Sequence, residues 1–214
     1  MSEALSEVVL KDRDYTVIVA KTAVSAFRSP PGFEDRWNEA RSAILALARQ
    51  CEAFDPDGIT VYVSSSDLTP PFKHYGQVTS DHLSQVFDEN YPPQALNLLD
   101  GLKAALDSYF DRKTAGQTKR NGEIIIVLID GEPADRMAVA HAIVEATHKL
   151  DQPQELGIGF AQVGEDIIAR GFLAALDENL RSTAGAKFDI VKTRVLETIE
   201  PETLTAFLLE ILQG

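Results

Sequence analysis

The chain has very little cysteine and no long apolar run. Cys51 is the single cysteine among 214 residues, so no disulfide can form within the chain, which is typical of a reducing compartment. No apolar stretch approaches the roughly 20 residues that a helix needs to cross a bilayer. The opening residues, MSEALSEVVLKDRDY, lack the basic and apolar regions of a secretory signal. We therefore expect a soluble, cytoplasmic protein.

Basic residues are also scarce. The chain has 20 Lys and Arg against 33 Asp and Glu, which gives a formal net charge of −13. This charge repels phosphate backbones and anionic lipid headgroups, and it argues against binding to nucleic acid or to membranes. An acidic surface either keeps the protein in solution or faces a basic protein partner or cations.

The overall composition of the chain is typical of a globular protein. It is 44% hydrophobic and 25% charged, enough apolar content for a core without disulfides or structural metals. We find no internal repeat and no linker long enough to separate domains. The sequence therefore predicts a single domain over residues 1–214, with residues 1–12 as an N-terminal extension.

Five short apolar runs predict buried strands. None alternates cleanly between apolar and polar residues, and continuous β-branched runs are typical of parallel strands that are covered on both faces. The predicted strands are residues 15–20, 59–63, 123–129, 156–163 and 188–191.

Helical patterns lie between these runs. In residues 35–54, apolar side chains recur every three or four positions, and Cys51 lies on this stripe as a core residue. The other predicted helices are residues 80–87, 97–112, 134–150, 166–180 and 201–212. Alternating strands and helices predict an α/β fold with a doubly wound, mostly parallel sheet and helices on both faces. The Pro-rich segment 64–77 predicts a loop with one short antiparallel edge strand around Lys73–Gly76.

The candidate chemistry lies in loops that follow strands. In a doubly wound sheet, the binding site lies beyond the carboxyl ends of the strands, where the strand order reverses. Asp130 directly follows the run 123–129 and begins the sequence Asp-Gly-Glu-Pro. It is either part of a site or an Asx-turn residue that accepts hydrogen bonds from the following backbone. Glu132 and Asp135 suit a helix start, where acidic side chains complement the helix dipole.

Other motifs predict structural roles. The chain has no Gly-x-Ser-x-Gly elbow and no His pair at metal-ligand spacing. Gly157 and Gly159 lie within a predicted strand, so they indicate close packing and not a dinucleotide fingerprint. The stretch 114–122 is interpreted as a polar, basic loop. Within it, Thr118-Lys119-Arg120 is interpreted first as solvated basic residues and second as a contact for an acidic partner.

Four stretches of the chain resemble a von Willebrand factor A domain of the stand-alone bacterial intracellular type. They are RDYTVIVAKTAVSAF at 13–27, FDPDGITVYVSSS at 54–66, LIDGEPAD at 128–135 and GFAQVGEDIIARGFLAALDENL at 159–180. The resemblance implies a doubly wound domain with a partner-binding surface at the strand ends. In most such domains this surface carries a metal-ion-dependent adhesion site, built from an Asp-x-Ser-x-Ser motif, a threonine and an aspartate. These hard oxygen ligands suit magnesium.

The same resemblance implies that this chain has lost most of the metal site. Ala20 stands at the leading aspartate, Val24 at the second serine and Leu96 at the threonine. Magnesium usually needs one or two carboxylates together with other ligands. We therefore predict no tightly bound metal and no other cofactor. A weak Mg²⁺ or Mn²⁺ site, if one survives, would use Thr22, Ser25 and Asp130.

The predicted function is non-enzymatic protein–protein interaction, with a partner of unknown identity that docks at the strand ends without a metal. The predicted partner-binding residues are Lys21, Thr22, Ser25, Ser65, Pro93, Leu96, Asp130 and Glu132. Two alternatives remain open. One is a domain that keeps weak Mg²⁺- or Mn²⁺-dependent ligand binding. The other is a metal-dependent phosphohydrolase in which Asp130 and Glu132 hold magnesium, although Ala20 stands where a second acid would be expected.

Overall fold

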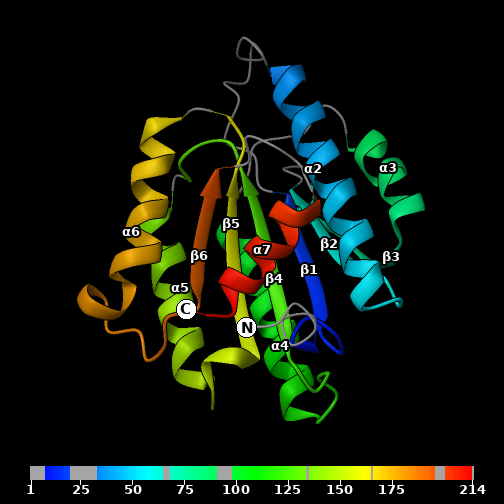
Figure 1. The fold of residues 1–214 in the computed structure, drawn as a ribbon. Coiled ribbons are helices and arrows are strands. Elements are labelled where there is room, and N and C mark those ends of the chain that lie inside the picture. The colour runs from blue at the N-terminus through cyan, green and yellow to red at the C-terminus, as the bar shows by residue number, and fades with distance from the viewer. Residues whose placement is uncertain are drawn as a thin grey trace.

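A six-stranded sheet lies at the centre of the computed structural model, which describes residues 8–19, 33–64, 68–90, 98–133, 135–164, 166–195 and 201–213 (Figure 1). The strand order is β3-β2-β1-β4-β5-β6. All neighbouring strands are parallel except β3, which pairs antiparallel with β2 at one edge. The strands are β1 (Asp14–Val19), β2 (Ile59–Ser64), β3 (Phe72–Val78), β4 (Glu123–Ile129), β5 (Leu156–Gln162) and β6 (Val191–Val195). The predicted mostly parallel sheet is confirmed, and its edge strand is longer than predicted.

Helices cover both faces of the sheet, as predicted. Figure 1 shows α2 and α7 in front of the sheet and α4 and α5 behind it. The helices are α2 (Phe33–Phe54), α3 (Ser80–Glu89), α4 (Leu98–Thr114), α5 (Arg136–Lys149), α6 (Ile167–Thr183) and α7 (Pro201–Ile211), with a short 3₁₀ helix η1 (Pro153–Glu155) before β5. None of the helices in the described part of the chain is long and apolar enough to cross a membrane.

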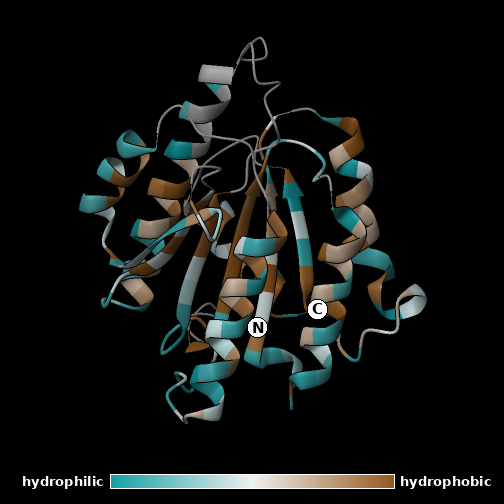
Figure 2. Ribbon diagram, turned by 180° about the vertical axis from the view of Figure 1, so that it is seen from behind, coloured by the Kyte–Doolittle hydropathy of each residue, from teal (hydrophilic) through white to brown (hydrophobic). Residues whose placement is uncertain are grey.

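Two hydrophobic cores result from the uninterrupted apolar strands. Successive side chains of a strand point to opposite faces. In β4, Ile124, Ile126 and Leu128 therefore pack with α2, α3 and α7, whereas Ile125, Val127 and Ile129 pack with α4, α5 and α6. The strands are brown along the middle of the sheet in Figure 2, and the helices that cover them carry teal outer faces. The buried Cys51 belongs to the first core, as predicted.

The two glycines of β5 let α7 pack directly on the sheet. A Cβ atom on Gly159 would lie 2.9 Å from Phe207 Cζ, and one on Gly157 would lie 2.5 Å from Ile211 Cγ2. Real Cβ atoms do not approach so closely, so any side chain at either position would force Ile211 or Phe207 of α7 to shift. This confirms that Gly157 and Gly159 serve close packing.

The last strand lies further along the chain than the prediction over 188–191. Residues 188–190 instead lead into β6, and Ile190 O accepts a hydrogen bond from Ile158 N at 2.7 Å. The strand itself reads VKTRV, with Lys192 and Arg194 partly exposed. Because β6 is an edge strand, it tolerates polar side chains that a central strand would exclude. Its sequence therefore lacks the apolar run by which the other parallel strands were predicted.

Candidate functional site

The strand order reverses between β1 and β4, so the carboxyl ends of these strands define the expected site. Asp130 directly follows β4 at this point and is partly buried. Gly131 and Pro133 after it are buried. Glu132 forms an ion pair with Arg136, at 2.7 Å between Glu132 Oε1 and Arg136 Nη1. The loop after β4 therefore places two acids at this edge of the sheet: Asp130, which is partly buried, and Glu132, which is paired with Arg136.

The start of α5 differs in detail from the prediction. Asp135 stands at the N-cap position, yet its side chain accepts no capping hydrogen bond, and the first turn of α5 contains no acidic residue. Glu132 is held by Arg136 instead of by the helix backbone. An acid so engaged is a poorer magnesium ligand, because a cation would have to displace the guanidinium.

Gln162 ends β5 beside β4, in register with Ile129, and the sequence analysis missed it. Its side chain is 1% exposed. Its Nε2 donates to Asp166 O at 2.9 Å, while its buried Oε1 has no hydrogen-bond partner among the described residues. The Asp166 carboxylate in turn caps α6 by accepting from Ile168 N at 2.8 Å and Ala169 N at 2.9 Å. Gln162 thus organises the loop beside Asp130. A polar residue at the end of an apolar strand was the available signal.

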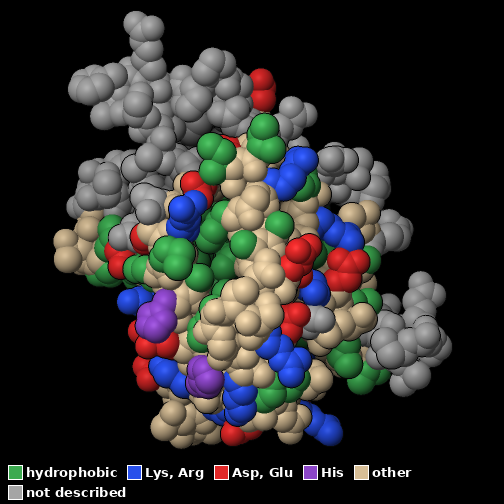
Figure 3. Space-filling model, turned by 90° about the vertical axis from the view of Figure 1, so that its left-hand side faces the viewer, with side chains coloured by type: hydrophobic (Ala, Val, Ile, Leu, Met, Phe, Trp, Pro, Cys, Tyr) green, Lys and Arg blue, Asp and Glu red, His purple; other side chains and the backbone are tan. Residues whose placement is uncertain are grey.

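Exposed apolar side chains also lie at the starts of α5 and α6, at the same edge of the sheet. Ile167 and Ile168 begin α6 and are 79% and 65% exposed, and Met137 near the start of α5 is 76% exposed. Leu68, in the loop after β2, is 44% exposed. Figure 3 views the molecule from the α6 side and shows hydrophobic side chains at the upper, carboxyl end of this face. We call Met137, Ile167 and Ile168 the apolar edge patch. In the sequence, this patch could have been recognised from the two isoleucines that stand between the cap residue Asp166 and the buried residues of α6.

The structure places only two of the eight predicted partner-binding residues. Asp130 and Glu132 lie at the carboxyl edge, as expected from their position after β4. The other six lie outside the described residues: Lys21, Thr22, Ser25, Ser65, Pro93 and Leu96. Ala20 and Val24, which bear on the metal site, also lie outside them. The predicted weakness of the metal site therefore stays a prediction from the sequence.

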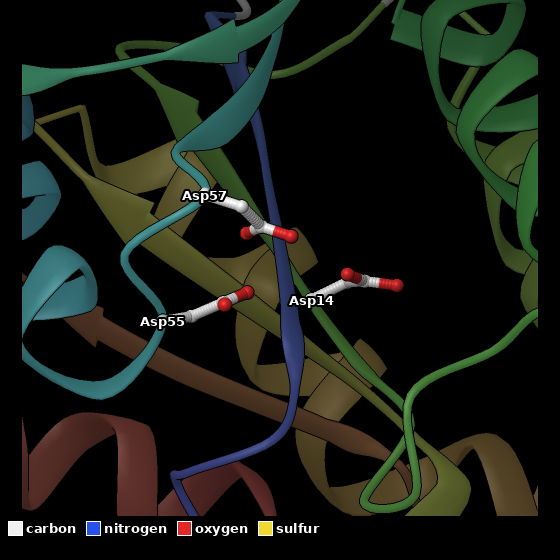
Figure 4. Close-up of side chains that lie close together, drawn as sticks. All are labelled: Asp14, Asp55 and Asp57. Atoms are coloured by element: carbon white, nitrogen blue, oxygen red, sulfur yellow. The ribbon is translucent and has the colours of Figure 1, made fainter.

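A cluster of acids lies at the opposite, amino edge of the sheet (Figure 4). Oxygen atoms of Asp14, Asp55 and Asp57 all lie within 4.8 Å of one another, the one group of three potential metal ligands within the described ranges. Lys119 Nζ lies among these carboxylates. It pairs with Asp55 and lies 2.8 Å from Asp57 and 3.6 Å from Asp14. The Lys119 ammonium therefore supplies the positive charge that a metal ion would bring.

Burial and ion pairing set the protonation of this cluster. Burial raises the pKa of Asp55, against the lowering effect of its hydrogen bond from Lys119. Burial alone would lower the pKa of Lys119, but its hydrogen bonds to Asp55 and Asp57 outweigh this and raise it. Lys119 is thus charged and partly buried, which corrects the interpretation of this lysine as a solvated residue, whereas Arg120 next to it is exposed as predicted. Its acidic contact lies within the same chain, because the turn before β2 brings Asp55 and Asp57 beside it.

Arg112 continues the network into the sheet. Its guanidinium pairs with Asp14 and with Glu123, whose side chain is 1% exposed. Burial raises the pKa of Glu123, and the nearby Arg112 opposes this rise. The amino edge is therefore a structural ion-pair network that joins β1, β4, α4 and two loops.

No known protein family matches the sequence, and no curated protein is similar to it at a significant level. Solved structures do share its fold. The pilus adhesin SpaC from Lactobacillus rhamnosus GG matches with 10% identity and a TM-score of 0.55, over 94% of this chain and 30% of that one. The manganese-loaded TRAP protein of Plasmodium vivax matches with 11% identity and a TM-score of 0.53, over 94% of this chain and 74% of that one.

Proximal thread matrix protein 1 from the mussel byssus also matches, with 12% identity and a TM-score of 0.52, over 94% of this chain and 47% of that one. The chain therefore spans about a third of SpaC and about half of the mussel protein. At such low identity these matches concern the fold alone. They support a von Willebrand factor A-like, Rossmann-like α/β fold.

Proposed function

We propose that this chain is a non-enzymatic protein-interaction module whose partner docks at the carboxyl edge of the sheet. The observation that carries the proposal is the apolar edge patch. Met137, Ile167 and Ile168 are each at least 65% exposed at the edge where a doubly wound fold binds its ligands. Large apolar side chains left in water at one edge of a domain are candidates for an interaction surface.

The chemistry of the edge favours binding over catalysis. Of the acids that follow β4, Glu132 is already paired with Arg136. A phosphohydrolase would need a metal held by at least one or two carboxylates, and Ala20 removes the acid expected after β1. The adhesin SpaC supports the proposal by analogy of fold, as a protein named for adhesion.

The contact would combine an apolar centre with charged surroundings. Burying one large aliphatic side chain contributes about 1.5–3 kcal/mol, and only part of this survives the cost of association. Asp130 and Asp166 lie on the segments that lead into α5 and α6, where the patch residues begin, so a partner with basic residues around an apolar contact would fit best. Lys21, Thr22, Ser25, Ser65, Pro93 and Leu96 are proposed to complete the surface.

A variant of the apolar edge patch tests the proposal. Met137→Gln, Ile167→Gln and Ile168→Gln are combined, because glutamine keeps helix propensity and removes the apolar contact. Val8→Gln is the matched control, since Val8 is a 58% exposed aliphatic residue at the amino edge. A photo-reactive residue at position 137 first identifies the partner by cross-linking in a native lysate. Binding of the purified partner is then measured by calorimetry.

We expect the triple variant to weaken binding by about 100-fold, roughly 2.7 kcal/mol, and the control to bind like the unaltered protein. We also expect EDTA to leave the affinity unchanged, because no bridging metal is proposed. Equal binding by the triple variant would refute docking at this edge. Release of the partner by EDTA, with recovery on adding Mn²⁺, would instead favour the weak cation site at Thr22, Ser25 and Asp130.

A further inference from the structure

A hollow of about 280 Å³ opens at the amino edge of the sheet, at the opposite edge from the apolar edge patch. The segment before β1, the turn before β4, η1 and the end of α7 meet there. Its walls differ in character. Leu209 and Leu212 of the α7 end form an aliphatic side, and Arg13 and Arg120 provide two guanidinium groups. The side chains of Asn121, Gln152 and Gln213 add carboxamides around the opening.

Arg13 is the unusual member of this lining. It is 2% exposed, although a buried charge is costly unless an opposite charge compensates it. Its guanidinium donates to three backbone carbonyls: Val9 O at 3.1 Å, Gln154 O at 3.1 Å and Glu123 O at 3.4 Å. Within the described residues, no carboxylate forms an ion pair with it. Burial lowers the pKa of Arg13 to about 10, so it still carries its charge at neutral pH.

Arg120 adds a second positive charge at the rim. It is exposed, and it forms no hydrogen bond or ion pair with the described residues. Glu155 is the acid in the lining, and both of its oxygens are already engaged. Its Oε1 accepts from Gln152 N at 2.9 Å, and its Oε2 accepts from Lys113 Nζ at 2.6 Å. The hollow is therefore positively charged on a chain whose net charge is −13.

We propose that this hollow binds a small organic oxyanion with a short aliphatic body. Arginine pairs with carboxylate and phosphate oxygens through parallel N–H donors, and it does so best where water is partly excluded. The head group would lie between Arg13 and Arg120, and the aliphatic body would lie against Leu209 and Leu212. A volume of about 280 Å³ is close to the lower end of ligand sites, which indicates a small ligand.

The test uses the whole chain labelled with nitrogen-15 and four probes: hexanoate, hexyl phosphate, hexylamine and inorganic phosphate. We expect hexanoate or hexyl phosphate to shift the backbone amide signals of Asn121, Gln152 and Gln213 in a saturable way. Hexylamine is expected to leave them unchanged, because the lining repels a cation. Stronger binding by hexyl phosphate than by hexanoate would identify a phosphate head group, and the reverse a carboxylate. Inorganic phosphate, which lacks the aliphatic body, is expected to bind more weakly than either.

The test variant is Arg120→Gln, which removes an exposed charge without disturbing the fold. Arg181→Gln, an exposed arginine on α6, is the matched control. We expect the first variant to raise the dissociation constant of the tighter probe about tenfold, and the control to leave it unchanged. The proposal is overturned if no anion shifts these amides, if hexylamine shifts them equally, or if Arg120→Gln binds like the unaltered protein. None of these outcomes bears on docking at the carboxyl edge.

Discussion

Lys119 holds three carboxylates together, and its removal should destabilise the fold in a pH-dependent way. In Lys119→Met, the aliphatic stem is kept and the ammonium beside Asp14, Asp55 and Asp57 is lost. Breaking a fully buried ion pair costs about 3–5 kcal/mol, and breaking an exposed pair costs about 0–1 kcal/mol. The side chains of Asp55 and Asp57 are 8% and 54% exposed, so the cluster lies between these limits. We expect a loss of about 2–3 kcal/mol at neutral pH.

The pH dependence follows from Asp55. Its pKa is already raised by burial, and the hydrogen bond from Lys119 holds it down. Without Lys119 the pKa of Asp55 in the folded state rises further. A carboxyl whose folded pKa lies above its unfolded pKa favours folding at low pH, and this contribution is lost as the pH rises through the folded pKa. The deficit of the variant should therefore be largest near neutral pH and shrink as the pH falls toward about 4.

Urea unfolding from pH 4 to pH 8 measures this effect, with the slope against urea checked for constancy. Lys103→Met is the control, because Lys103 is an exposed lysine on α4, and its loss should change stability by less than about 0.5 kcal/mol. Asp55→Asn combined with Lys119→Met should lose less than the sum of the two single changes, since the two groups interact directly. A deficit below about 0.5 kcal/mol, or one that grows as the pH falls, would refute this account of the cluster.

Three further predictions concern packing, reactivity and capping. Gly159→Ala should cost about 1–3 kcal/mol, because its Cβ would press on Phe207, whereas Gly171→Ala, which faces open space, should be neutral or stabilising in thermal unfolding. Burial raises the pKa of Cys51, so its thiol should react with Ellman's reagent only as fast as the protein unfolds, and fast labelling in native buffer would contradict its place in the core. Asp166→Ala should cost about 1 kcal/mol through the lost α6 cap, and no change in the unfolding midpoint would show that the cap contributes nothing.

Much of the architecture was readable along the chain because its causes are local. A run such as EIIIVLI at 123–129 cannot leave either face in water, so it required a strand with helices on both sides. The glycines of β5 similarly indicated a close neighbour. The edge strand β6 was placed too early, because an edge strand carries polar side chains and loses the apolar signal.

The site was less predictable, because its members come together only in the folded chain. Asp130 could be expected at the carboxyl edge, since the residue after a parallel strand must lie there. A polar residue at a strand end and two isoleucines after a cap residue were local signals, but they did not indicate that Gln162 would be buried beside β4 or that Met137 and Ile167 would be left exposed. These properties depend on which helix start lies beside which strand end.

The sequence by itself determined the class of fold, the core character of Cys51 and the position of Asp130 after a buried strand, because hydrophobic periodicity and strand polarity act over a few residues. Only the tertiary structure decided which charged residues pair with one another and which are buried. Asp14, Asp57 and Lys119 lie far apart along the chain and meet at one edge. Arg13 is buried against carbonyls of residues more than a hundred positions away. The interaction between two charges depends on their distance in space, and this distance cannot be deduced from their positions along the chain.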